Sequence, residues 1–232
     1  MSEWWTYRPS DFLMFAPDTY WRLFELHNAA LWPFQLLPPV VLLVLAAAIA
    51  AGPSNRSDAA FRCGVVGLAM CWAFVAWSFL WQRYAPINWA AHTFAIGFVV
   101  QALGLLALAF LPGLHTTPQP GRRLCALTLL VWAALAHPLL ALAFDRPLAQ
   151  AELFGAAPDP TALATVGWLL WADARSRSGR LLLWALRGMA LVWCAISAST
   201  LWTMGSAQAG VMLAAGLVAL GSIWRWPYGR PG

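Results

Sequence analysis

The chain has 232 residues, of which 61% are hydrophobic and only 10% are charged, and its mean hydropathy is +0.65. A water-soluble globular protein of this size needs more polar residues than this to cover its surface. The composition therefore argues against a soluble protein. The net charge is +5, yet the chain has no lysine and its arginines are spread along the sequence in small groups. This spread favours topology signals and lipid-headgroup contacts, and we expect no nucleic-acid partner.

Residues 1–30 are predicted to form an amphipathic segment that lies along the outer membrane surface. Within it Tyr20, Phe24, His27 and Leu31 recur at helical spacing, and its tryptophans suit the headgroup level. No cleavable signal peptide is predicted, because the first apolar run begins late and has no basic segment before it.

Residues 31–232 are interpreted as one transmembrane domain with about seven spans, since a crossing needs about 20 apolar residues. The predicted fold is therefore an all-α, polytopic helical bundle with an amphipathic helix at its N-terminus. The expected spans are 31–51, 62–82, 89–111, 123–144, 159–173, 181–203 and 207–225.

The fifth span is the weakest of the seven. The stretch Phe154-Gly-Ala-Ala-Pro-Asp-Pro-Thr161 places a Gly/Pro break before an apolar run that is too short for a full crossing. Either the bilayer is thin at this point or neighbouring helices shelter the segment. In the alternative six-span topology, Arg225 and Arg230 would lie on the outer side.

The arginines predict the orientation in the membrane, because the cytoplasmic side retains more positive charge. When the gaps between spans are assigned alternately to two sides, one side holds Arg56, Arg62, Arg122, Arg123, Arg175, Arg177, Arg180, Arg225 and Arg230. The other side holds only Arg8, Arg22, Arg83 and Arg146. We therefore expect the N-terminus outside and the C-terminus in the cytoplasm. Most acidic residues then face outward: Glu3, Asp11, Asp18, Glu25, Asp145, Glu152 and Asp159.

Several polar residues fall near the predicted outward ends of the spans, where ionisable groups are candidates for a ligand or ion pathway. The candidates for a ligand-binding cavity are His27, Asn28, Asn88, His92, Gln101, His137 and Asp159. His92 and His137 differ in depth by only about 5 Å, so we expect them to face one cavity. Two histidines are also the minimum for a b-type haem or a metal. Structural hydrogen bonding is the alternative role, and no cofactor is favoured.

Arg187 is predicted to extend its side chain to the cytoplasmic lipid headgroups, with a buried contact as the alternative. An interfacial belt is expected to account for most tryptophans, namely Trp32, Trp81, Trp89, Trp168, Trp171, Trp184, Trp202, Trp224 and Trp226. Trp72, Trp77, Trp132 and Trp193 are expected to lie deeper.

No motif of a known enzyme class is recognisable in the sequence. A protein without lysine cannot form a Schiff base with retinal, and there is no phosphate-binding glycine loop, nucleophile elbow or His-Glu-x-x-His. The four cysteines form no Cys-x-x-Cys pair and are interpreted as small core residues. We therefore do not expect an enzyme.

Three segments resemble a family of uncharacterised bacterial membrane proteins, DUF6064. They are Phe24-Glu-Leu-His-Asn-Ala-Ala-Leu-Trp-Pro-Phe-Gln35, Tyr84-Ala-Pro-Ile-Asn-Trp-Ala-Ala91 with Gln101 beyond it, and the Gly/Pro break at 154–161. The resemblance covers almost the whole chain and implies a small protein of the bacterial inner membrane with no established activity. Relatives commonly carry tyrosine where His27 stands and cysteine where Asp159 stands, so the resemblance marks neither residue as catalytic.

The leading functional hypothesis is a non-catalytic accessory subunit or ligand-binding module that acts through its outward face. Its expected partners are membrane lipids and either other membrane subunits or a second copy. The alternative is a transporter or channel for a small solute, with an outward-facing polar cavity beside the broken fifth span. A third hypothesis is a redox protein that binds haem or metal through His92 and His137. The sequence names neither the ligand nor the partner.

Overall fold

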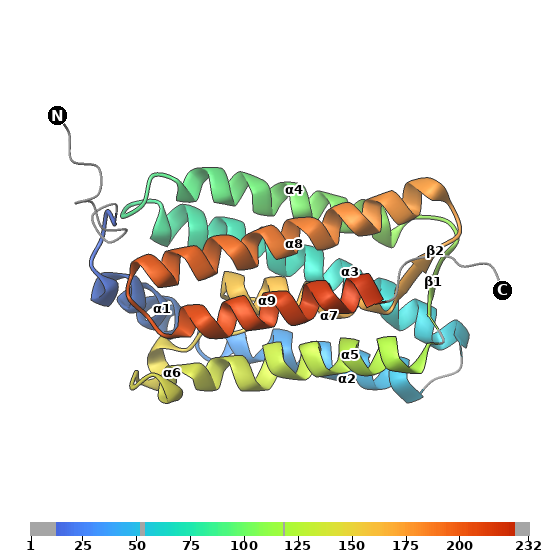
Figure 1. Ribbon diagram of the computed structural model, residues 1–232, viewed down its shortest axis with the longest axis horizontal. Helices are drawn as coiled ribbons and strands as arrows, with labels where there is room; N and C mark the ends of the chain where they lie inside the picture. The colour runs from blue at the N-terminus through green and yellow to red at the C-terminus, as the bar shows by residue number, and fades with distance from the viewer. Residues whose placement is uncertain (1–12, 52–53, 118, 226–232) are drawn as a thin grey trace.

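The structure, a computed structural model, describes residues 13–51, 54–117 and 119–225, which form an elongated helical bundle (Figure 1). Its long helices are α1 (Pro17–Leu31), α2 (Leu37–Ala51), α3 (Ser54–Phe74), α4 (Ala91–Ala109), α5 (Pro120–Val131), α7 (Pro158–Leu170), α8 (Arg177–Thr203) and α9 (Gln208–Arg225). The shorter helical segments are η3 (Phe34–Leu36), the π-helical η4 (Val75–Tyr84), which continues α3, η5 (Trp132–Ala136), η6 (His137–Leu139), α6 (Leu140–Ala143) and η7 (Leu148–Gln150). The predicted all-α fold is confirmed.

The two ends of the bundle differ. Helices α1 and α6 lie at one end, which we call the α1 end (Figure 1). Two three-residue strands, β1 (Leu114–Thr116) and β2 (Ala172–Ala174), lie at the other, which we call the β end. The strands pair antiparallel, with Leu114 opposite Ala174, and join the α4–α5 connection to the α7–α8 connection.

Six helical segments among the described residues are long and apolar enough to cross a membrane. They are Phe34–Ala51, Arg56–Tyr84, Ala91–Ala109, Pro120–Ala143, Arg177–Thr203 and Gln208–Arg225. Each corresponds to a predicted span, which is the architecture of a multi-pass membrane protein. The predicted fifth span, 159–173, corresponds to α7 and is not among the six.

Helix α7 runs between the two ends of the bundle but is short. Its 13 residues cover about 20 Å, against about 30 Å of hydrocarbon in a bilayer. All 13 are buried, and the helix packs against α3, α5, α8 and α9. A helix enclosed by protein need not match the bilayer thickness, so the predicted shelter by neighbouring helices is what the structure contains.

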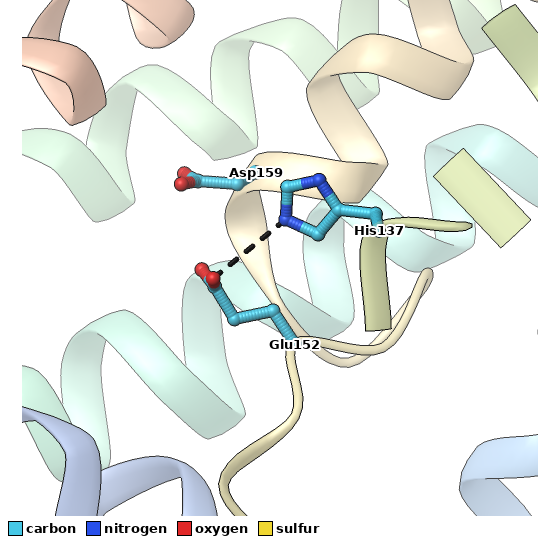
Figure 2. A group of neighbouring side chains, drawn as sticks. All are labelled: His137, Glu152 and Asp159. Atoms are coloured by element: carbon cyan, nitrogen blue, oxygen red, sulfur yellow. Dashed lines mark ion pairs between the residues drawn. The ribbon is translucent and has the colours of Figure 1, made fainter. Parts of the chain in front are cut away.

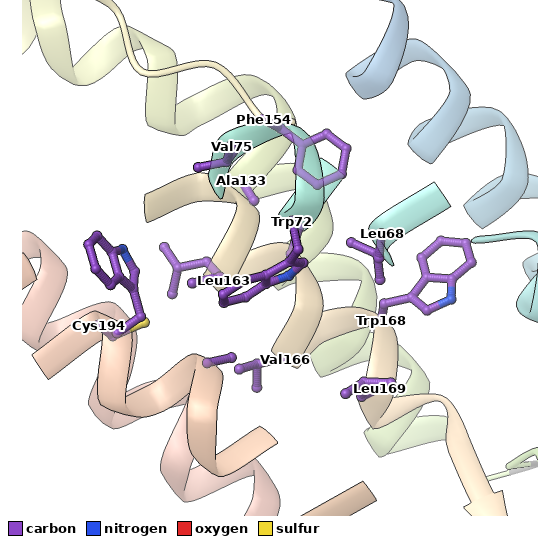
Figure 3. Packing of buried hydrophobic residues seen from close by; sticks show 14 of the residues in the cluster. Leu68, Trp72, Val75, Ala133, Phe154, Leu163, Val166, Trp168, Leu169 and Cys194 are labelled. Atoms are coloured by element: carbon purple, nitrogen blue, oxygen red, sulfur yellow. The ribbon is translucent and has the colours of Figure 1, made fainter. Parts of the chain in front are cut away.

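The core is built around α7 (Figure 3). The indole of Trp72 on α3 donates to the Thr165 hydroxyl at 2.7 Å, and the indole of Trp168 donates to the Phe61 carbonyl at 3.2 Å. Helices α5 and α7 touch closely at Gly167, where an added Cβ would lie 2.9 Å from the Leu129 Cβ. These contacts lock α7 among its neighbours.

Sequence features at each end of α7 satisfy its free backbone groups. At the N-terminus Pro158 and Pro160 carry no N–H, so two donors that a helix start normally leaves unpaired are absent. At the C-terminus Arg187 donates to the carbonyls of Leu169 and Ala172, and Arg122 also donates to Ala172. Positive charge at a helix C-terminus is favourable in addition, because the helix dipole is negative there.

The expectation that Arg187 reaches the lipid headgroups is therefore wrong. Its side chain is 1% exposed and turns inward from α8 to the end of α7. The buried alternative prevails because the short α7 ends at a depth where its carbonyls need donors from protein.

The tryptophans divide between the surface and the core. Trp32, Trp89, Trp202 and Trp224 are highly exposed near helix ends, as an interfacial belt requires. Trp168 and Trp171 were assigned to the same belt and are instead buried in the core. They belong to α7 and its end, which the other helices enclose. Trp77, expected to be deep, is exposed on the outer surface of η4, and Trp226 and the first twelve residues lie outside the described residues.

Candidate functional site

Three buried ionisable side chains meet near the α1 end of the bundle (Figure 2). They are His137, Glu152 and Asp159, which we call the His–Glu–Asp cluster. One potential metal-ligand atom from each lies within 4.8 Å of the others, and each side chain is at most 2% exposed. The His137 Nε2 to Glu152 Oε2 distance is 3.7 Å, longer than a direct hydrogen bond.

Each member of the cluster comes from a local break in regular helix. His137 follows the π-helical turn η5 and precedes Pro138, which cannot donate a backbone hydrogen bond. Glu152 lies in the connection between η7 and α7, and Asp159 is the second residue of α7. A π turn adds one residue to a helical turn and so changes which side chains face inward beyond it.

Helix α8 holds both oxygens of Asp159. The Trp193 indole donates to Oδ1 at 2.8 Å, and the Ser197 hydroxyl donates to Oδ2. These two donors are four residues apart and so lie on one face of α8. The carboxylate is thereby fixed in position, with one oxygen within 4.8 Å of the ligand atoms of His137 and Glu152.

A line of polar contacts joins Glu152 to the surface of the α1 end. The side-chain amide of Gln208, at the start of α9, donates to Glu152 Oε2 at 2.5 Å, and its Oε1 accepts from Arg146 at 2.5 Å. The Arg146 guanidinium lies 3.4 Å from the ring centroid of Trp21. Burial raises the pKa of Glu152, but the interactions with His137, Gln208 and Arg146 together outweigh it and lower that pKa below its ordinary value.

Three atoms of the cluster have no hydrogen-bond partner among the described residues. They are both ring nitrogens of His137 and Oε1 of Glu152, all fully buried. Buried polar atoms are nearly always paired in folded proteins, so several unpaired ones in one buried cluster indicate a bound group or water. Imidazole nitrogen and carboxylate oxygen are the ligands that Zn²⁺ and similar transition metals prefer. The arrangement can hold such an ion.

His27 and Asn28 on α1 hold the segment that carries Glu152. Asn28 donates to the carbonyls of Ala149 at 2.9 Å and Ala151 at 2.8 Å. Arg83 donates to His27 Nδ1 at 2.7 Å, and so the proton on the ring is at Nε2, 3.2 Å from the Ala156 carbonyl. Burial and the Arg83 charge lower the pKa of His27 to about 4. The side chains of His27 and Asn28 therefore contact backbone carbonyls of this chain.

The remaining predicted candidates lie apart from the cluster. Asn88 accepts from the backbone N–H of Ala90 before α4, and the Gln101 amide on α4 donates to the Leu186 carbonyl of α8 at 2.9 Å. His92 is exposed and packs edge-on against Trp81. The structure therefore does not bring His92 and His137 to one cavity, because His92 faces the outer surface of the bundle and His137 is buried inside it. A haem or metal held by that pair is not supported.

The sequence predicted both His137 and Asp159 as candidates for one cavity, but it did not predict the other side chains that contact them or each other at the site. These are Glu152, Gln208, Trp193, Ser197 and Arg146. Glu152 offered a signal, since it is a carboxylate inside the apolar stretch that leads to the Gly/Pro break. Gln208 and Ser197 offered none, because isolated neutral polar residues are common at helix ends.

Comparison with known proteins gives a family and no activity. A family model described as "Family of unknown function (DUF6064)" matches residues 17–228. The chain belongs to the DUF6064 family. The match includes all three members of the His–Glu–Asp cluster and confirms the resemblance drawn from the sequence. No curated protein and no solved structure matches the chain.

Proposed function

We propose that this DUF6064 protein is a non-catalytic membrane protein that binds one divalent transition-metal ion, of the Zn²⁺ type, at the His–Glu–Asp cluster. The observation that carries the proposal is the convergence of three buried ligand groups, within which both His137 ring nitrogens and Glu152 Oε1 have no hydrogen-bond partner among the described residues. In a bacterial inner membrane with the N-terminus outside, the ion would lie close to the outward face.

The distances within the cluster suit a metal. Two ligands about 2.1 Å from a tetrahedral ion lie about 3.4 Å apart, and His137 Nε2 is 3.7 Å from Glu152 Oε2. A small closure of the site would bring both atoms to coordination distance. Three protein ligands would leave a fourth position for water or another ligand.

The charges and surroundings of the cluster also suit a divalent cation. With a metal bound, two deprotonated carboxylates would bring two negative charges to the site, which a divalent ion balances, whereas unbalanced charges in a protein interior are very costly. Trp193, Ser197 and Gln208 donate to carboxylate oxygens of the cluster. Such outer hydrogen bonds orient metal ligands and support binding.

A route for the ion leads from the surface of the α1 end. An open hollow there is lined by Asp18, Thr19, Trp21, Arg22, Asp145, Arg146, Pro147 and Gln150. Arg146 both lines this hollow and contacts Gln208, which contacts Glu152. Movement of the Arg146 side chain would open the line from solvent to the cluster.

The test is metal content after purification in mild detergent and equilibration with Zn²⁺ followed by desalting. We expect about one ion per wild-type chain by elemental mass spectrometry, and less than a tenth of that in His137→Ala and Glu152→Gln. His92→Ala is the matched control, because it removes an exposed histidine from the same end of the bundle, and it should keep the ion. With Co²⁺ as the probe, the wild type should show the visible absorption of a low-coordinate site. A wild-type chain that holds no metal, or variants that keep it, would overturn the proposal.

Transport is the second candidate, favoured by the polar line from the open hollow to a site beside the enclosed helix α7. Beyond Asp159 towards the β end, the polar residues of α7 are Thr161 and Thr165, whose hydroxyls donate to carbonyls one turn earlier. A carrier would have to open this closed, largely apolar half of the bundle. Uptake of Zn²⁺ into proteoliposomes that depends on His137 would support transport, and binding without uptake would support the binding module.

A further inference from the structure

A groove opens on the outer surface of the bundle, between α2 and α3, and its lining includes Phe154, Gly155 and Ala156. It has a volume of about 460 Å³. The walls come from Leu37, Val41 and Leu45 on α2 and from Gly67, Met70 and Phe74 on α3, and the backbone of 154–156 closes its outward end. We call it the α2–α3 groove.

Glycines create the groove. A Cβ at Gly67 would have no atom within 4 Å, so the missing side chain leaves open space in the α3 wall. Gly155 has a φ of +82°, which favours glycine, and a Cβ there would lie 2.6 Å from Pro38. The absence of that Cβ allows the Glu152 segment to pass close against α2 and close the groove.

We propose that the α2–α3 groove binds one acyl chain of a membrane glycerophospholipid. Both walls belong to membrane-crossing segments, and several wall residues, such as Val41 and Met70, are exposed at the mouth. The medium at the mouth of the groove is therefore bilayer hydrocarbon. A methylene group is about as large as a water molecule, about 30 Å³, so the groove has room for about 15 of them, which is the length of one acyl chain.

The amide oxygen of Gln35, in the wall of the groove, bears on which lipid headgroup would bind. The side chain of Gln35 lines the groove and is 7% exposed, and its Oε1 has no donor among the described residues. Gln35 lies just before α2, at the α1 end, where the glycerol and headgroup of an outer-leaflet lipid would lie. An unpaired amide oxygen at this level favours a headgroup with a hydrogen-bond donor, such as the ammonium of phosphatidylethanolamine or the hydroxyls of phosphatidylglycerol.

The occupant is distinct from the metal ion of the proposed function, because the groove offers neither a carboxylate nor an imidazole. Its wall does share residues 154–156 with the segment that carries Glu152 and with the Ala156 carbonyl contacted by His27. A bound chain would therefore press on the backbone that positions Glu152. The inference stands or falls independently of the metal.

The first experiment is photocrosslinking of the wild-type chain in nanodiscs that contain phosphatidylethanolamine with a diazirine in one acyl chain. Peptide mapping should place the crosslinks on α2 and α3 at least five-fold more often than on the exposed faces of α4 and α9. Crosslinks spread evenly over all lipid-facing helices would overturn the proposal. This measurement needs no variant, so it does not depend on any substitution folding.

The second experiment fills the groove. Gly67→Phe should lose one retained phosphatidylethanolamine per chain in native mass spectrometry and most of the α2 and α3 crosslinks. Gly97→Phe is the matched control, since Gly97 is a half-buried glycine of α4 with no atom within 4 Å of its Cβ position, and it should keep both. Equal lipid retention by the two variants would contradict the assignment.

The third experiment tests the headgroup. The wild type should retain phosphatidylethanolamine or phosphatidylglycerol several-fold better than phosphatidylcholine, whose headgroup has no donor. Gln35→Leu should abolish that preference while retaining an acyl chain. Preference for only one of the two donor lipids would identify which headgroup binds, and an unchanged preference in Gln35→Leu would refute the role of the amide.

Discussion

Replacement of Arg187 by methionine is expected to weaken the attachment of α7 at its C-terminal end. The guanidinium donates to the carbonyls of Leu169 and Ala172 inside the protein. Methionine keeps most of the volume of the side-chain stem but has no donor. Arg122 still donates to Ala172 in the variant, so the main loss is the donor to Leu169.

The size of the effect follows from the loss of one bond to a charged donor, since the Leu169 carbonyl keeps the Trp171 N–H. A hydrogen bond to a charged group contributes about 1.5–3 kcal/mol. We therefore expect the free energy of unfolding to fall by about 2–3 kcal/mol. For a chain of this length each kcal/mol corresponds to about 2–4 °C, so Tm should fall by about 4–12 °C.

The assay is thermal unfolding in detergent, followed by tryptophan fluorescence at one fixed heating rate, because the midpoint of an irreversible transition depends on that rate. Arg177→Met is the matched control: it removes an exposed arginine from the first turn of α8 and should shift Tm little. Arg187→Met combined with Arg122→Met should cost more than the sum of the two single changes, since both arginines share the Ala172 carbonyl. Wild-type stability in Arg187→Met would show that the side chain reaches the headgroups and would refute this reasoning.

Three further predictions concern stability, packing and orientation. Because the folded-state pKa of His27 is about 4 and the unfolded value is about 6.5, the unfolded chain binds more protons between these values. Stability should thus fall by about 3 kcal/mol as pH drops from 6.5 to 4, and in His27→Gln acid denaturation should lose this component. Gly167→Leu should reduce expression or Tm sharply, because its Cβ would press on α5, while Gly188→Leu, with no atom within 4 Å of its Cβ position, should be tolerated; equal effects would contradict the close α5–α7 contact. In a cysteine-free background, Ser178→Cys at the β end should resist an impermeant thiol reagent in intact cells, and Thr19→Cys at the α1 end should react; the opposite pattern would reverse the orientation.

The lengths of the apolar stretches, and the glycines and prolines that interrupt them, could be read from the sequence. Six spans follow from the need to cover the hydrocarbon thickness, and the break at Gly155, Pro158 and Pro160 identifies the short fifth element because those residues restrict the backbone locally. Such properties depend on residues close together in the chain. They also sufficed to recognise the family.

Which side chains meet was decided by the tertiary structure. Residue counts place His92 and His137 at similar depths, but depth says nothing about rotation around the helix axis. The π turn before His137 changes that rotation and leaves no mark in the sequence pattern. Glu152 joins the site because α1 holds its segment against the bundle through contacts more than 100 residues apart in the chain. Arg187 is long enough to reach either lipid or protein, and only the position of the end of α7 determines its direction. The sequence by itself therefore determined where the long apolar helices and the short fifth element lie, whereas packing among distant elements determined the cluster, since rotation and neighbour order are set by contacts that no local pattern encodes.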